Sequence, residues 1–111
     1  MKKIEAITKP YKLDAIKEAL VDLGIEGMTV SEVRDLRAGS FLSHQRSFQD
    51  DYLPRLKLEI VVRDELVEEA VNAIQRSAAA MPSDQDGTIL VEPVENSLRI
   101  RTGEKSDRTT L

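Results

Sequence analysis

Apolar residues recur along this chain at two spacings, and the alternation between the spacings predicts a sequence of strands and helices. Residues 28–33 and 56–63 carry an apolar residue at roughly every second position, as in a strand with one face against a core. Residues 13–24 and 66–80 repeat at helical spacing. Residues 4–7, 88–94 and 98–101 complete the pattern as further strands, the last of them short.

The predicted helices have clear apolar stripes and recognisable ends. The stripe residues are Leu13, Ile16, Leu20 and Leu23 in the first helix, and Leu66, Val67, Ala70, Val71 and Ile74 in the second. Gly24 is placed to end the first helix, because glycine adopts the left-handed conformation that many helix C-termini need. Asp64 is placed to cap the N-terminus of the second.

The order strand–helix–strand occurs twice, in two halves of similar size. Right-handed crossovers in both halves give an α+β, ferredoxin-like βαββαβ split fold with a short C-terminal fifth strand, in a single domain spanning residues 1–111. Both helices would cover one sheet face. On the third strand the other face carries Lys57, Glu59, Val61 and Arg63. This mixed surface fits an interface between copies of the chain, and it fits a solvent-exposed face equally well.

A long polar connection separates the second and third strands. The stretch 34–54 has no helical stripe, and residues 38–53 form its central loop. Loops of this length inside a compact domain are usually functional or disordered, so a binding role is favoured over a solvated hairpin tip.

Composition and charge narrow the classes of function. The 111 residues are 41% hydrophobic and 32% charged, with a formal net charge of −4, which indicates a globular protein without the basic surface that nucleic acids require. No cysteine is present, and no signal peptide or membrane span is apparent, so a cytoplasmic protein is expected. No nucleophile–base–orienter set and no metal-ligand cluster stand out, which argues against an enzyme. The charged tail from 103 to 111 is expected to be flexible.

Four segments resemble the PII family of nitrogen-regulatory signal-transduction proteins. They are MKKIEAITKPYKLDAIKEAL, GMTVSEV, LPRLKLEIVV and LRIRTGE, and together they span nearly the whole chain. The resemblance implies a homotrimer that binds an adenine nucleotide in the clefts between subunits. It also implies that loop 38–53 docks on a target protein, either a membrane transporter or an enzyme.

The resemblance also implies the residues of the ligand sites. For the nucleotide these are Thr29, Asp35, Leu36, Arg37, Glu59, Val61, Gly87, Thr88, Arg99 and Arg101; for a small anion they are Arg37 and Arg55. Independently of the family, Arg99 and Arg101 lie two residues apart in a predicted strand, and two guanidiniums on one face form an anion clamp. The alternative is that they are solvated or pair with Glu59 or Asp86.

Two stretches depart from the family pattern. Typical members have Gly-Phe-Gly-Arg-Gln-Lys-Gly-His after the second strand, whereas this chain has Asp35 to Ser40, without the glutamine that helps to hold magnesium and 2-oxoglutarate. Typical members have Thr-Gly-Lys-Ile-Gly-Asp-Gly-Lys before the fourth strand, and here Thr88 replaces the last lysine. We therefore expect AMP or ADP to bind more tightly than ATP, with bicarbonate as a co-ligand and inorganic-carbon metabolism as one setting.

Two other functions stay open at this point. The first is a conventional nitrogen regulator that senses ATP and 2-oxoglutarate, against which the missing glutamine and lysine count. The second is a structural or interaction module that binds no ligand.

Overall fold

The computed structural model describes residues 1–36, 52–79 and 87–105, and these form a four-stranded sheet with two helices. The strands are β1 (Lys2–Thr8), β2 (Thr29–Leu36), β3 (Tyr52–Val62) and β4 (Thr88–Pro93). Their order across the sheet is β2-β3-β1-β4, and every neighbouring pair is antiparallel. This is the predicted ferredoxin-like arrangement, because each strand–helix–strand half encloses one strand of the other half.

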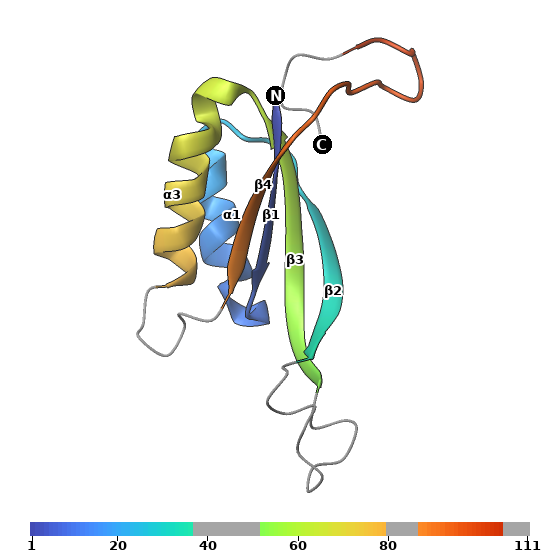
Figure 1. Ribbon diagram of the computed structural model, residues 1–111. Helices are drawn as coiled ribbons and strands as arrows, with labels where there is room; N and C mark the ends of the chain where they lie inside the picture. The colour runs from blue at the N-terminus through green and yellow to red at the C-terminus, as the bar shows by residue number, and fades with distance from the viewer. Residues whose placement is uncertain (37–51, 80–86, 106–111) are drawn as a thin grey trace, which may run out of the picture.

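Both helices cover the same face of the sheet (Figure 1). A 3-10 turn, η1 (Pro10–Lys12), leads into α1 (Leu13–Asp22), and a second one, η2 (Asp64–Leu66), leads into α3 (Val67–Ala78). Gly24 ends α1 as predicted: its φ is 85°, its N–H donates to the Val21 carbonyl, and the Ile25 N–H reaches back to the Leu20 carbonyl.

The predicted cap at Asp64 is wrong. Neither η2 nor α3 has a side-chain cap, because the chain enters α3 through the 3-10 turn, of which Asp64 is the first residue. The Asp64 carboxylate instead accepts a hydrogen bond from the Met1 amino group at 2.6 Å. That contact and the positive charge of the amino group hold the pKa of Asp64 below its usual range.

The core lies between the sheet and the helices. Its largest buried side chains are Ile4, Ile16, Leu20, Leu58, Ile60, Val62 and Ile74. Alternate positions on β3 point into it, so the apolar face predicted for residues 56–63 contributes Leu58, Ile60 and Val62 to the core. We call the opposite side of the sheet, which carries Lys57 and Glu59, the open face.

The structure moves the predicted ends of two strands and removes a third strand. β2 continues to Leu36 and β3 begins at Tyr52, so both ends of stretch 34–54, and residues 52–53 of the predicted loop, belong to strands. The short fifth strand at 98–101 does not form: within the described residues it is replaced by a turn, with a single bridge between Leu98 and Lys105. Alternation alone predicted a strand, but the Gly103 N–H donates to the Arg99 carbonyl at 2.7 Å and bends the chain back.

Candidate functional site

The predicted nucleotide residues fall at two ends of the sheet. Thr88 pairs with Ile7 at the end of β1, whereas the last residue of β4, Pro93, pairs with Lys2 at its beginning. Lys2 and Ile7 are five residues apart, which is about 17 Å along a strand. The segment that follows β4 and carries Arg99 and Arg101 therefore lies at the Met1 end (Figure 1).

A pocket of about 540 Å³ marks the end of the sheet where β4 begins. It is lined by Ala6, Ile7, Thr8, Val71, Ile74, Gln75, Ala78, Ala79, Gly87, Thr88 and Ile89. Asp35 and Leu36 of β2 lie toward the same end, since they pair with Leu53 and Tyr52, beyond the partner of Thr8. Arg37 lies outside the described residues.

Gly87 has a backbone role at the mouth of this pocket. Its φ is +155°, and a Cβ atom placed there would lie 2.7 Å from the backbone oxygen of Ile7. Only a glycine lets the chain approach β1 this closely without moving a strand. The backbone, rather than a side chain, is therefore what residue 87 offers to a ligand.

Replacing Gly87 with alanine should destabilise the protein by more than about 1 kcal/mol, because the new methyl group meets the β1 backbone at an unfavourable φ. Gly24→Ala is the matched control, since φ there is 85° but nothing lies within 4 Å of the added atom. Urea unfolding of both variants measures the difference. Equal losses in the two variants would contradict the proposed close approach.

Thr29, Glu59 and Val61 lie together nearer the Met1 end, on the open face. Thr29 stands directly opposite Glu59 in the β2–β3 register, and Glu59 stands opposite Glu5 in the β3–β1 register. The Lys57 Nζ lies 3.5 Å from Glu59 Oε1, and the Lys3 Nζ lies 3.7 Å from Glu59 Oε2. Glu59 is therefore already held by two cations within one protomer.

Lys3 also contacts Glu5, with 2.8 Å between Nζ and Oε1. The hydrogen bond from Lys3, helped by the positive charges of Lys3 and Lys57, holds the pKa of Glu5 below its usual range. A lowered pKa in the folded state gives stability that is complete above the unfolded value, about 4.3, and is lost as the pH falls through the folded value.

The stability advantage of the wild type over Glu5→Gln should therefore shrink as the pH falls below about 4.3. Thermal unfolding of both proteins between about pH 2 and pH 7 measures it. A stability difference that stays constant over this range would show that the Lys3–Glu5 pair does not respond to protonation of Glu5.

Arg99 and Arg101 are exposed in the turn after β4, rather than on one face of a strand. The Arg99 N–H donates to the Glu104 carbonyl, and the Gly103 N–H donates to the Arg99 carbonyl, so the backbone of the turn is held. Neither guanidinium forms an ion pair with a carboxylate in the described part of the chain. The suggested pairing of either arginine with Glu59 is therefore absent, and the other suggested partner, Asp86, lies outside the described residues.

Arg55 is nearly buried, in contrast to the exposed Arg99 and Arg101, because only 9% of it is exposed. Within residues 1–36, 52–79 and 87–105, its one hydrogen bond runs from Nη1 to the Pro54 carbonyl at 2.9 Å. A guanidinium has five N–H donors, so the described residues satisfy only a small part of its hydrogen-bonding capacity.

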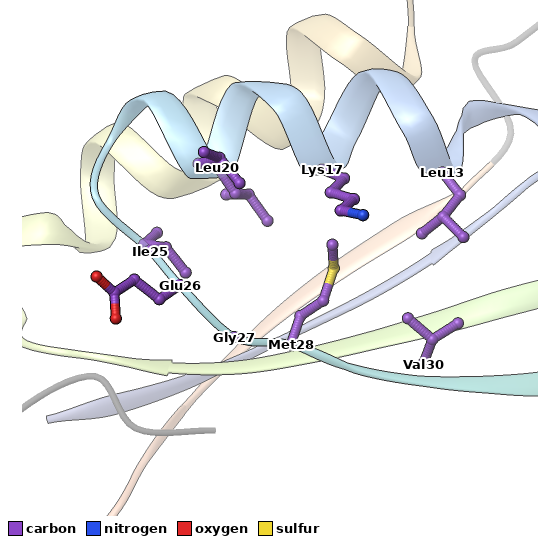
Figure 2. Close-up of a pocket in the computed structure, with 9 residues that line it drawn as sticks. Leu13, Lys17, Leu20, Ile25, Glu26, Gly27, Met28 and Val30 are labelled. Carbon is purple, nitrogen blue, oxygen red and sulfur yellow. The ribbon is translucent and has the colours of Figure 1, made fainter.

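A second pocket, which the sequence did not predict, lies between α1 and the start of β2 (Figure 2). Its volume is about 380 Å³, and its lining includes Leu20, Met28 and Val30, with Lys17 pointing into it. None of the predicted site residues lines this second pocket. Elsewhere in the described ranges, no three His, Asp or Glu side chains gather closely enough to hold a metal ion.

Comparison with known proteins identifies the family. The family model described as "Nitrogen regulatory protein P-II" matches residues 1–104. The protein of that name from Azospirillum brasilense is 49% identical over 108 residues, which cover 95% of this chain and 96% of the relative. The chain belongs to the P-II family.

Two further P-II proteins show how widely the likeness extends. The Haemophilus influenzae protein is 46% identical and "Nitrogen regulatory protein P-II 1" of Escherichia coli K12 is 44% identical, each over 110 residues, 96% of this chain and 97% of the relative. P-II proteins are regulators of signal transduction rather than enzymes, so the chain is a regulatory protein. No helix in the part of this P-II chain that the structure describes is long and apolar enough to cross a membrane.

Proposed function

We propose that this P-II protein is a nitrogen-regulatory signalling homotrimer that binds an adenine nucleotide in clefts between its copies. The names of its relatives favour nitrogen regulation over the inorganic-carbon setting that the sequence analysis put first. A cytoplasmic location, and a target transporter or enzyme reached through loop 38–53, belong to the same proposal. Most of that loop lies outside the described residues.

The observation that carries the proposal is the separation of the two groups of site residues. Gly87 and Thr88 border the pocket at one end of the sheet, while Arg99 and Arg101 follow β4 at the other end. One protomer therefore cannot close both groups around a single nucleotide. A second copy would complete the site if it brought its arginines to the Thr88 end of the first copy. The Thr29, Glu59 and Val61 of this second copy would then lie near the adenine base.

The exposed arginines and the uncharged Thr88 support a preference for short phosphate chains. Two exposed guanidiniums can hold the first phosphates in bidentate hydrogen bonds. At the third phosphate Thr88 supplies no charge where the family has lysine, and a lost charge-assisted hydrogen bond costs about 1.5–3 kcal/mol. We therefore propose that AMP and ADP bind at least as tightly as ATP.

Arg55 supports a second ligand, a small anion bearing a carboxylate. A nearly buried guanidinium that uses one of its five donors among the described residues is costly unless an anion, water or another acceptor satisfies the rest. Bicarbonate and 2-oxoglutarate both offer such a group. A conventional nitrogen regulator of this family would take 2-oxoglutarate, whereas the missing glutamine favours the smaller ion.

Titration calorimetry with AMP, ADP and ATP tests this function, with and without magnesium, 2-oxoglutarate and bicarbonate. Binding of AMP or ADP at micromolar affinity, by a protein with the mass of a trimer in light scattering, supports the proposal. Tightest binding by magnesium-ATP would refute the ranking. A monomer that binds no nucleotide would refute the function.

A further inference from the structure

The pocket between α1 and β2 lies on the other side of the sheet from the open face. Thr29 and its partner Glu59 belong to the open face, whereas Val30 pairs with the buried Leu58 and lines the pocket under α1 (Figure 2). The pocket volume of about 380 Å³ is within the range of small-molecule sites. The pocket is therefore a candidate site in its own right.

The lining of this pocket is mostly apolar, and part of it is uncovered. Leu20 and Ile25 are its most buried residues, with exposures of 1% and 3%. Val21 and Val30 are its most exposed apolar residues, at 55% and 41%. Met28 is half-buried and adds a flexible thioether that adapts to the shape of a ligand. An apolar group bound here would remove exposed valine surface from water, which favours binding.

One cation reaches into this apolar pocket. The Lys17 side chain runs from α1 toward Met28, between Leu13 and Leu20 (Figure 2). Asp14 lies three residues earlier on the helix, a spacing at which ion pairs commonly form, yet Lys17 makes no ion pair with any described residue. The ammonium group of Lys17 therefore offers hydrogen-bond donors to an anion in the pocket.

The acidic residues around Lys17 limit the charge of that anion. Asp14, Glu18 and Asp22 border a hollow on the outer side of α1 together with Lys17, and Glu26 lines the pocket itself. A second negative charge on a ligand would meet these carboxylates, and like charges repel each other. The pocket therefore favours an anion of single charge over a phosphate dianion.

We propose that this pocket binds an alkyl monocarboxylate of the medium-chain fatty acid class. The carboxylate accepts a charge-assisted hydrogen bond from the Lys17 ammonium, and the alkyl chain covers Met28 and Val30. This inference is independent of the proposed nucleotide site, because no residue of that site lines the pocket.

Octanoate is the probe, and the methyl group of Met28 is the reporter. The chain has three methionines, and the NMR spectrum of Met28→Leu identifies the Met28 methyl signal. Octanoate should shift this signal in a saturable manner and leave the Met1 signal in place, because Met1 does not line the pocket. Octanol, which has the same chain without the charge, should bind about tenfold more weakly, the loss typical of one charge-assisted hydrogen bond. Octyl phosphate should also bind more weakly than octanoate, because of its second charge.

Variants of the two kinds of contact complete the test. Lys17→Met should lower the octanoate affinity about tenfold and leave the octanol affinity unchanged, and Lys17→Arg should retain most of the octanoate affinity. Lys105→Met is the same change at an exposed lysine outside the pocket and should have no effect. Val30→Asp should also weaken octanoate binding, because it adds a carboxylate to the lining. Val91→Asp, at a position of similar exposure on β4, is its matched control.

Four results would overturn the proposal. The first is a Met28 signal that does not move in octanoate up to about 10 mM, or that moves no more than the Met1 signal. The second is octanol or octyl phosphate binding as tightly as octanoate. The third is wild-type octanoate affinity in Lys17→Met. The fourth is a Met28 signal that moves on dilution of the protein without octanoate, which would mean that a second copy covers the pocket.

Discussion

Arg101→Ala should weaken the binding of AMP and ADP roughly ten- to hundredfold, because it removes charge-assisted hydrogen bonds worth about 1.5–3 kcal/mol from the first phosphates. Arg101 is exposed in the turn after β4 and has no ionic partner in the described part of its own chain. The loss of Arg101 should therefore change the stability of the free protein little, and the effect should appear in the affinity for the nucleotide. Titration calorimetry with AMP measures it.

Lys105→Ala is the matched control for this prediction. Lys105 is an exposed cation of the same segment, joined to Leu98 by a backbone bridge that the substitution leaves intact. It should weaken AMP binding by less than about threefold, the scale of an exposed charge. Equal losses in the two variants would mean that the segment attracts phosphate only by its overall charge. Wild-type affinity in Arg101→Ala would remove the arginine from the site.

Ile60→Ala should lower the free energy of unfolding by about 2–5 kcal/mol, through lost burial and the cavity left behind. Ile60 is 1% exposed near the end of β3, opposite Ile4 of β1, and belongs to the core cluster under the helices. Urea unfolding measures the loss.

Ile100→Ala is the same chemical change at a fully exposed position, with a relative exposure of 104%. Within one protomer it should change stability by less than about 0.5 kcal/mol. Unfolding at several protein concentrations extends the control, because a loss that grows on dilution would show that Ile100 contacts another copy. Ile100→Ala as costly as Ile60→Ala at every concentration would contradict the core assignment.

Most of the fold follows from apolar periodicity alone. The alternation of Leu58, Ile60 and Val62 in β3, the α1 stripe with Ile16 and Leu20, and the α3 stripe with Ile74 predict which faces meet. All six residues are buried. Periodicity does not show whether a strand will find a partner strand. Residues 98–101 alternate, but the turn at Gly103 leaves them with a single bridge instead of a ladder of paired residues. Periodicity also fails at Asp64, since spacing does not show that the chain enters α3 through a 3-10 turn.

The site is only partly visible in the sequence. The family motifs predict that Thr29 and Glu59 bind the nucleotide, and the register brings the two residues opposite each other. The contact between Lys3 and Glu59 could not be predicted, because which residue of β1 faces Glu59 depends on the offset between two strands that are distant in sequence. The burial of Arg55 could not be predicted either. Alternation places Arg55 on the open face with Lys57, and only the three-dimensional structure shows that it is covered.

Mixing two defective variants tests most directly whether the nucleotide site is shared between copies. Thr88→Glu places a carboxylate in one half of the proposed site. The double variant Arg99→Ala/Arg101→Ala removes both guanidinium groups from the other half. Each protein alone should bind AMP poorly. Co-expressed as mixed oligomers with different tags, they should regain wild-type affinity in a fraction of the sites, where the intact half of one chain meets the intact half of the other. Mixed oligomers that bind AMP no better than either variant alone would contradict a site built between copies.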